Sequence, residues 1–246
     1  MKPCTYLGVL GGLGPMSTVY FCELLNRHTA AVCDADHIDM LISSRATTPD
    51  RTSYILDKNA PDPLPVMLSE AHRLERAGVD LIVMPCNTAH YFYDGLAQNC
   101  QVPILNIIDE TTAHLARIGV QTFGLLATEG TIRSGAYERF CTPRGLSCFP
   151  PTKDEQAIIT DIIFGQIKQN KSVDMKAFNS VVTSLCSRGC EKIVLGCTEL
   201  SLLKKQGLDD ALFVDSLDVL AYRTIVACGK TPIGFPSSFD GEEAAR

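Results

Sequence analysis

The sequence predicts an α/β protein made of two pseudo-symmetric domains, each with a mostly parallel sheet covered by helices. Three observations lead to this fold class. Strand and helix patterns alternate along the chain, the second half repeats the first, and the strands are continuous apolar runs such as Leu81–Met84 and Ile193–Leu195. Continuous apolar strands are typical of parallel sheets with both faces buried, whereas half-exposed strands alternate apolar and polar residues.

Length and composition limit the function classes. The chain has 246 residues, of which 46% are hydrophobic, and a formal net charge of −6. This composition is too apolar for a disordered chain, too charged for a membrane protein, and its apolar runs are far shorter than a membrane span. An acidic balance without a Lys/Arg block argues against nucleic acid or an anionic membrane as a partner. No signal-peptide pattern precedes the first predicted strand, so we expect a cytoplasmic protein.

The spacing of the cysteines does not indicate a disulfide framework. There are 11 cysteines, without a repeated disulfide spacing or a C-x-x-C pair. The sequence also lacks an H-E-x-x-H segment and a clustered Cys/His array, so we expect no metal site. Reduced thiols are therefore expected, and most of them should be small buried residues of the core.

The first half predicts its elements in a regular order. A strand over residues 6–10 stops at a glycine-rich turn, and Pro15 suits the start of the following helix, where its missing N–H costs little. A second strand is expected over 38–43. A helix then begins near Pro65, with Gly78 as its C-terminal cap.

The second half repeats this order. When Cys197 is superimposed on Cys86, Gly189 falls on Gly78, and the strand Ile193–Leu195 falls on the strand before Cys86. Matched glycines are common in α/β proteins, but packing does not require a cysteine at the same strand end in both halves. Ligands of open α/β sheets bind at the carboxyl ends of the strands. We therefore expect Cys86 and Cys197 to lie on opposite sides of one cleft between the domains.

A thiol at such a strand end can act as an acid or a base. Unpaired backbone N–H groups at the start of a helix or turn favour the thiolate, which lowers the pKa of a cysteine. One thiolate can remove a proton from a carbon atom while a thiol on the opposite face donates one. This transfer inverts the carbon and needs no metal and no bound cofactor. Cys86 and Cys197 are followed by polar residues that can cap the turn or hold a substrate carboxylate: Asn87, Thr88 and Thr198.

Other motifs are weaker. The turn around Gly12 lacks the full G-x-G-x-x-G of dinucleotide-binding loops, so we expect it to let a small anion approach the backbone. His90 lies four residues after Cys86, which suits a Cys–His hydrolase as well as a capping or packing role. From the sequence alone, Arg51, Lys168 and Glu199 are ordinary solvated charges.

Two segments, Val83–His90 and Ile193–Leu200, resemble the two signature segments of aspartate/glutamate racemases, which are isomerases that work without pyridoxal phosphate. The resemblance covers nearly the whole chain, because further segments are similar to aspartate-racemase segments: 11–15, 49–52, 125–131 and 154–168. The chain has two glycines where cell-wall glutamate racemases carry Asp-Ser, which places it nearer the aspartate branch.

The resemblance implies two flavodoxin-like domains with the active site between them, often in a homodimer, and no cofactor. It implies that Cys197 deprotonates the L-enantiomer and Cys86 the D-enantiomer of aspartate, and possible activity on glutamate. Arg51 and Lys168 resemble the family's ligands for substrate carboxylates. Further residues are implied to line the pocket and bind the α-carboxylate and amine: Asn87, Thr88, Thr128, Thr131 and Thr198.

Rival functions stay open on the sequence. A related cysteine-dependent isomerase of a dicarboxylate such as maleate, or a hydantoin racemase, uses similar chemistry, but the presence of both cysteines favours amino-acid racemisation. A non-catalytic amino-acid binding protein would keep its affinity without the thiols and would incorporate no deuterium at Cα. A thiol redox protein is the remaining alternative, and it lacks support from a C-x-x-C pair.

The repeat and the resemblance together suggest the domain boundaries. We expect the first domain to hold residues 1–102 and 211–246, and the second to hold 103–210. A helix from Ser216 to Cys228 would then cross back to the first domain. The tail from Pro232 to Arg246 is rich in Pro, Ser, Gly and acids, and should be loosely held.

Overall fold

A computed structural model describes residues 4–208 and 211–240. Besides short 3₁₀ turns, the elements of the first half are β1 (Leu7–Gly11), α1 (Pro15–His28), β2 (Met40–Ser44), α2 (Arg51–Leu56), α3 (Leu64–Arg76), β3 (Leu81–Val83), α4 (Tyr93–Asn99) and β4 (Ile104–Leu105).

The second half follows in the same alternating order. Its elements are α5 (Ile107–Arg117), β5 (Thr122–Leu126), α6 (Glu129–Arg133), α7 (Ala136–Cys141), β6 (Ser147–Phe149), α8 (Lys153–Thr160), a π-helical segment (Asp161–Gln166), α9 (Met175–Ser187), β7 (Lys192–Leu195), β8 (Phe213–Asp215) and α10 (Ser216–Ala227).

Each half contains one sheet of four parallel strands. The orders are β2-β1-β3-β4 and β6-β5-β7-β8, which are the same when each half is counted from its own first strand. Val9 is paired with Val83 in the first sheet, and Leu125 is paired with Val194 at the matching place in the second. The predicted α/β fold with two similar halves is confirmed, and the strand order is that of flavodoxin-like folds.

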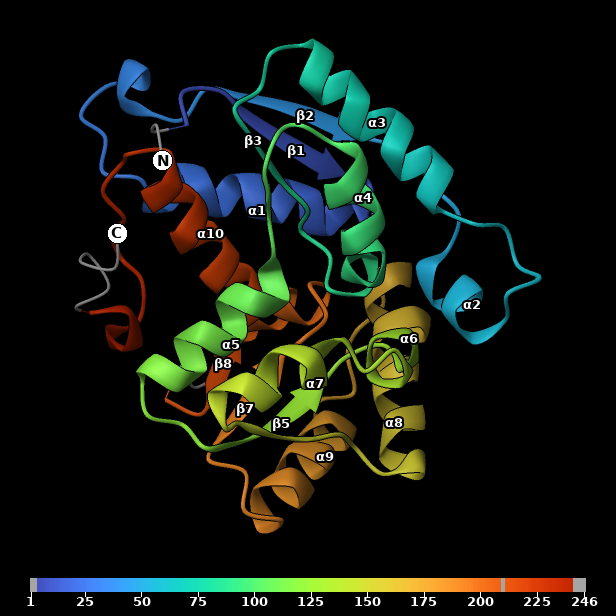
Figure 1. Cartoon of the computed structure of the whole chain (residues 1–246). Helices are drawn as coiled ribbons and strands as arrows, with labels where there is room; N and C mark the ends of the chain where they lie inside the picture. Colours follow the sequence, from blue (N-terminus) through green and yellow to red (C-terminus); the bar gives the residue numbers. More distant parts are fainter. Residues whose placement is uncertain (1–3, 209–210, 241–246) are drawn as a thin grey trace.

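The strands are apolar at successive positions because both faces of each sheet are covered. Val9 and Val83 face a core that contains α1, α5 and α10, whereas Leu10 and Ile82 face α3 and α4 on the outer side. In the second sheet, α8 and α9 cover the outer face. Figure 1 shows α5 and α10 between the two halves, so that one central core is shared by both sheets.

The predicted helix ends are confirmed. Pro15 is the first residue of α1. The N–H groups of Gly78 and Gly189 donate to carbonyls in the last turns of α3 and α9, and both residues have positive φ angles of 84° and 89°. Side chains with a Cβ rarely adopt this conformation, which explains the glycine at both places.

Strand pairing differs from the predicted domain boundaries at two places. β4 lies after residue 102 but pairs with β3, and β8 lies after residue 211 but pairs with β7. Each predicted boundary therefore assigns the last strand of one sheet to the other half. Strands of two and three residues are too short to give a periodic signal. Beyond β8, α10 packs against both α1 and α5.

The described part of the C-terminal segment is more firmly held than expected. The N–H of Ile233 donates to the carbonyl of His28 at 2.8 Å. Phe239 is 6% exposed, and its ring centroid lies 4.9 Å from that of Tyr222. The aromatic residue anchors the segment because burying it removes a large apolar surface from water. The rest of the predicted loose tail, residues 241–246, lies outside the described residues.

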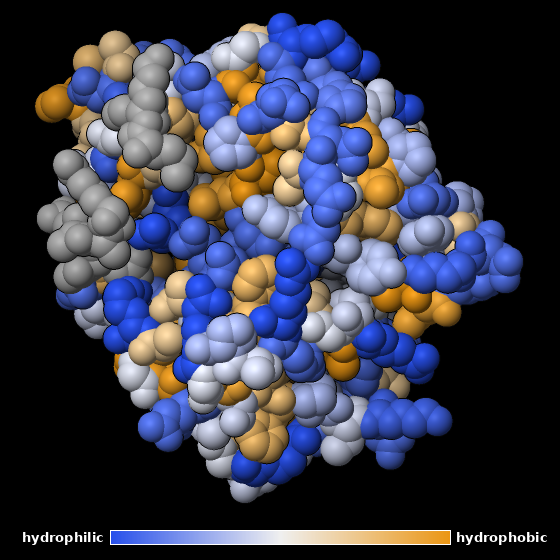
Figure 2. Space-filling view, in the orientation of Figure 1, coloured by the Kyte–Doolittle hydropathy of each residue, from blue (hydrophilic) through white to orange (hydrophobic). Residues whose placement is uncertain are grey.

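The surface mixes polar and apolar residues over the face shown in Figure 2. No helix in the ranges 4–208 and 211–240 has the length and apolar character that a membrane span needs.

Candidate active site

The carboxyl ends of β3 and β7 bring the two predicted thiols to one cavity. Cys86 and Cys197 both line it, and they are only 6% and 4% exposed. The space between the lining residues is about 290 Å³, part of which is open to solvent. The prediction that the two strand ends share one cleft agrees with this geometry.

Cys86 follows β3 in a tight turn, in which its N–H donates to the carbonyl of Met84 at 2.8 Å. Burial raises the pKa of the Cys86 thiol, and the guanidinium of Arg51 and the N–H of Ala89 oppose this rise. From the sequence, backbone N–H groups are expected to lower the pKa of this thiol. That prediction is wrong, because the loss of water around the thiolate outweighs the nearby donors.

Cys197 has a partner that the sequence argument missed. Its Sγ donates to Oε2 of Glu199 at 3.0 Å. Burial raises the pKa of Cys197 well above its usual value, and the negative charge of Glu199 adds to the rise. Cys197 is therefore a thiol in this arrangement. The only sequence signal for Glu199 was its place two residues after the cysteine, inside the strand-end turn.

Glu199 also contacts the second cation of the cavity. Its Oε1 lies 3.4 Å from Nζ of Lys168. The Lys168 ammonium lies 4.5 Å from the ring centroid of Phe164, which belongs to the π-helical segment just before it. Burial by itself lowers the pKa of Lys168, but the negative charge of Glu199, with the thiolate forms of Cys197 and Cys86, raises it above its usual value. Lys168 is therefore held as a cation at the cavity.

Arg51 is the first residue of α2 and is 8% exposed. Its Nη2 donates to the carbonyl of Leu13 at 2.6 Å, and its Nη1 donates to the carbonyl of Pro49 at 3.1 Å. Its Nε is buried without a partner. Nε–H is therefore an unused donor on a residue that lines the cavity.

Hydroxyl groups join the two halves beside the cavity. The Thr88 hydroxyl lies 2.9 Å from the hydroxyls of both Thr128 and Thr131. Thr198 donates across the halves to the carbonyl of Pro85 at 3.3 Å. Thr88, Thr128 and Thr198 line the cavity, whereas Thr131 lies behind Thr88 and is not part of the lining.

Asn87 lines the cavity, but both ends of its side chain are already engaged. Its Nδ2 donates to Ser216 at 2.9 Å, and its Oδ1 accepts from the Tyr137 hydroxyl at 2.8 Å. These contacts tie the strand-end turn to α10 and α7. The amide therefore helps to position the turn, while the second hydrogen of Nδ2 is not used by these two bonds.

His90 does not contact the thiol. Its Nδ1 lies 2.8 Å from the carbonyl of Cys86, and its Nε2 accepts from the N–H of Ile107 at 3.2 Å. Burial lowers the pKa of His90 to about 4, so the ring is neutral and donates through Nδ1. With both nitrogens bonded to backbone, His90 fastens the turn to the start of α5, which removes the Cys–His hydrolase interpretation.

A larger pocket of about 950 Å³ adjoins the cavity and shares Asp50, Arg51, Lys168 and Glu199 with it. Gly12 lies here and not in the cavity itself. Its positive φ of 79° disfavours a residue with a Cβ, and the backbone of Arg45 lies too close to leave room for a side chain.

Comparisons with known proteins identify similar chains among amino-acid racemases. A family model described as Asp/Glu/Hydantoin racemase matches residues 10–224. A broad-specificity amino-acid racemase of Bacillus subtilis is 28% identical over 224 residues, which is 89% of this chain and 96% of that protein. A glutamate racemase of Aquifex pyrophilus is 30% identical over 157 residues, which is 60% of this chain and 58% of that protein. The structure of Picrophilus torridus aspartate racemase superimposes with a TM-score of 0.81 at 28% identity, covering 93% of this chain and 96% of that one.

Proposed function

This chain belongs to the Asp/Glu/Hydantoin racemase family, and from that premise we propose that it interconverts L- and D-aspartate by two-base proton transfer between Cys86 and Cys197. The family resemblance drawn from the sequence is confirmed, and the chain is an amino-acid racemase, an isomerase. The finer assignment of substrate and mechanism is our proposal.

One observation supports the mechanism above the others: both thiols line the same small cavity, together with Arg51 and Lys168. A protein that only binds amino acids needs the cations but has no use for a buried thiol on each strand end. A redox protein needs the thiols but has no use for the cations. Stereoinversion of an amino acid uses all four side chains.

The proton balance requires one thiolate and one thiol. The thiolate takes the proton from Cα and becomes a thiol, while the opposite thiol gives its proton to the other face of Cα and becomes a thiolate. The substrate leaves with inverted configuration, and the enzyme is left with the roles of Cys86 and Cys197 exchanged. One proton must then move between the two sulfur atoms, through solvent or a side chain, before the same enantiomer can react again.

The cations lower the barrier to this transfer. An α-proton of an amino acid is a very weak acid, because the negative charge it leaves must be delocalised into a carboxylate that is already negative. Donors that are already in place where the charge develops stabilise the transition state more than they stabilise the substrate. The unpartnered Nε of Arg51 is such a donor, and Lys168 supplies a point charge nearby.

Glu199 controls the protonation of Cys197 in this mechanism. Its carboxylate accepts from the Cys197 thiol at 3.0 Å, and its charge raises the pKa of that thiol. Glu199 therefore holds the proton on Cys197 until the thiol donates it to Cα. Its ion pair with Lys168 keeps the carboxylate oriented.

Two observations support different substrate ranges. The small volume of the cavity and its two cations favour a short dicarboxylic amino acid such as aspartate. The adjoining pocket and the broad-specificity relative of Bacillus subtilis favour a wider range of side chains. We propose aspartate as the preferred substrate, with glutamate next.

The test is proton NMR of each enantiomer of aspartate in D₂O with the reduced enzyme. Racemisation predicts loss of the Cα–H signal together with accumulation of the opposite enantiomer. Cys86→Ser and Cys197→Ser should each abolish inversion, because a serine hydroxyl is far too weak an acid to replace the thiol. Cys22→Ser, on α1 and away from the cavity, is the matched control and should keep full activity. A glutamate, hydantoin and maleate panel identifies the substrate if aspartate shows no exchange, and exchange with none of them would refute the mechanism.

A further inference from the structure

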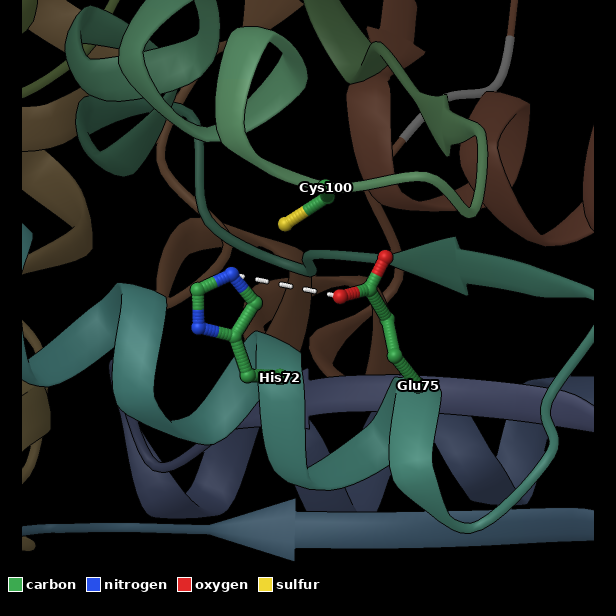
Figure 3. Close-up of side chains that lie close together, drawn as sticks. All are labelled: His72, Glu75 and Cys100. Carbon is green, nitrogen blue, oxygen red and sulfur yellow. Dashed lines mark ion pairs between the residues drawn. The ribbon is translucent and has the colours of Figure 1, made fainter.

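A second group of reactive side chains lies away from the cavity. The side chains of His72, Glu75 and Cys100 each offer one ligand atom, and these atoms all lie within 4.8 Å of one another. His72 and Glu75 come from α3, and Cys100 directly follows α4 (Figure 3). The group lies where the chain leads into β3 and β4, which is the edge of the sheet opposite to the carboxyl ends that deliver Cys86.

Local structure sets this arrangement. His72 and Glu75 are three residues apart on one helix, so their side chains share a face. Oε1 of Glu75 accepts from the N–H groups of Gln101 at 2.5 Å and Val102 at 2.9 Å. These bonds fix the carboxylate, and its other oxygen lies 3.9 Å from Nε2 of His72.

We propose that this group is a binding site for a zinc-type divalent cation, held by the imidazole of His72, the carboxylate of Glu75 and the thiolate of Cys100. A mixed set of nitrogen, oxygen and sulfur ligands suits Zn²⁺, whereas Mg²⁺ and Ca²⁺ take oxygen ligands alone. Three protein ligands leave the fourth tetrahedral position for water. The backbone bonds to Glu75 serve as the outer contacts that orient a metal ligand.

A divalent cation would change the local electrostatics around His72, Glu75 and Cys100. Burial raises the pKa of the Cys100 thiol, and the charge of Glu75 adds to this rise. A divalent cation favours the thiolate, so binding releases the thiol proton to solvent. The His72 nitrogen gives up its contact with the carbonyl of Asn99, now 2.8 Å away. The His72 side chain is 41% exposed, which gives the ion a path from solvent.

A bound ion would tie the end of α3 to the end of α4. Because it binds the folded chain and not the unfolded one, it should raise the melting temperature. At a free concentration about 100 times the dissociation constant, we expect a rise of about 5 °C or more. The site lies apart from the cavity, so its test does not depend on the proposed racemase mechanism.

The test uses the full chain with Cys86→Ser and Cys197→Ser, so that the cavity thiols cannot bind metal. After chelator treatment and reduction, Zn²⁺ is titrated by calorimetry and Co²⁺ by absorption spectroscopy. We expect one equivalent of bound metal, a thiolate-to-cobalt charge-transfer band, and the rise in melting temperature. Cys100→Ala should abolish the band, and His72→Ala should weaken affinity by at least about 10-fold.

Two further variants keep the result decisive. Glu75→Gln retains an oxygen for the backbone N–H groups but loses the charge, so it should fold and bind more weakly even if Cys100→Ala fails to fold. Cys33→Ser removes an exposed thiol elsewhere and should leave binding unchanged. The absence of stoichiometric binding, or a band and an affinity that survive both Cys100→Ala and Glu75→Gln, would overturn the proposal.

Discussion

Gly14→Ala tests the position of Glu199 without changing any charged group. A Cβ at residue 14 would lie 2.4 Å from Oε1 of Glu199. Gly14 has φ −154° and ψ 119°, which alanine also adopts, so the substitution acts through the clash alone. The carboxylate must then move by about 0.6 to 1 Å to reach an ordinary contact distance.

That displacement should affect the proposed proton transfer. The moving carboxylate either lengthens its 3.0 Å hydrogen bond from Cys197 or leaves Lys168, which is already 3.4 Å away. A misplacement of about 1 Å in a catalytic group costs on the order of 100-fold in rate. We therefore expect kcat for aspartate to fall by about 100-fold, while overpacking lowers the free energy of unfolding by only about 1–3 kcal/mol.

The assay is racemisation of both enantiomers, followed by circular dichroism, with thermal unfolding to establish that the variant is folded. The matched control is a double-mutant cycle with Glu199→Ala. Once the carboxylate is absent, Gly14→Ala should add little, because the two substitutions act on one contact. Wild-type kcat in a folded Gly14→Ala protein would refute the placement of Glu199 and its proposed role.

Three further predictions concern charge. Arg51→Lys keeps the positive charge but loses the Nε–H donor, so KM for aspartate should rise by about 10- to 100-fold in steady-state assays, and an unchanged KM would remove Arg51 from the substrate site. Burial lowers the pKa of His90 to about 4, so the folded protein loses stability as pH falls from about 6.5 toward 4, by about 3 kcal/mol at most. His90→Gln should therefore give a flatter dependence of melting temperature on pH over that window. An equally steep dependence in the variant would contradict this prediction. Burial, with Asp218 adding to it, raises the pKa of Asp215 to about 7, so its contribution to stability falls as pH rises from about 4 to 7. Asp215→Asn should therefore gain stability relative to wild type between pH 5 and pH 8 in denaturant titrations, and a constant difference would show that the carboxyl is not the cause.

Sequence reasoning succeeded where a residue type reports its own surroundings. Continuous apolar strands predicted sheets buried on both faces, and glycine after a helical pattern predicted the positive φ of Gly78 and Gly189. The matching thiols at two strand ends predicted one shared cavity, because ligands of open α/β sheets bind at the carboxyl ends of the strands and the two such ends were expected to face one cleft. In each case, local physical chemistry is enough.

The sequence does not predict side-chain orientations that depend on tertiary contacts. His90 and Glu199 each follow a cysteine within four residues, and nothing in the sequence says which one turns toward the thiol. The N–H of Ile107 from α5 captures His90, whereas Glu199 meets the Cys197 thiol and Lys168. The group of His72, Glu75 and Cys100 could not be predicted from the sequence for a similar reason, since Cys100 follows a different helix from the one that carries His72 and Glu75.

The pseudo-symmetry of the fold is broken at the thiols, and this has a measurable consequence. Cys86 is opposed by the positive Arg51, whereas Cys197 donates to the negative Glu199. Burial raises the pKa of both thiols, and Glu199 adds to the larger rise at Cys197 through its hydrogen bond, whereas Arg51 opposes the rise at Cys86. In the proposed mechanism, we therefore expect Cys86 to lose its proton first and to start as the base, with Cys197 as the acid.

This asymmetry cannot appear in kcat/KM. Enantiomers have equal free energies in water, so the equilibrium constant is unity and kcat/KM must be the same in both directions at every pH. The difference should instead appear in thiol reactivity, because the thiolate is the nucleophile. With limiting iodoacetamide and peptide mapping by mass spectrometry, Cys86 should be alkylated before Cys197, and Glu199→Gln should narrow the gap by removing the charge that holds the Cys197 proton. Faster alkylation of Cys197 in the wild-type protein would show that the charges of Arg51 and Glu199 do not set the order of ionisation.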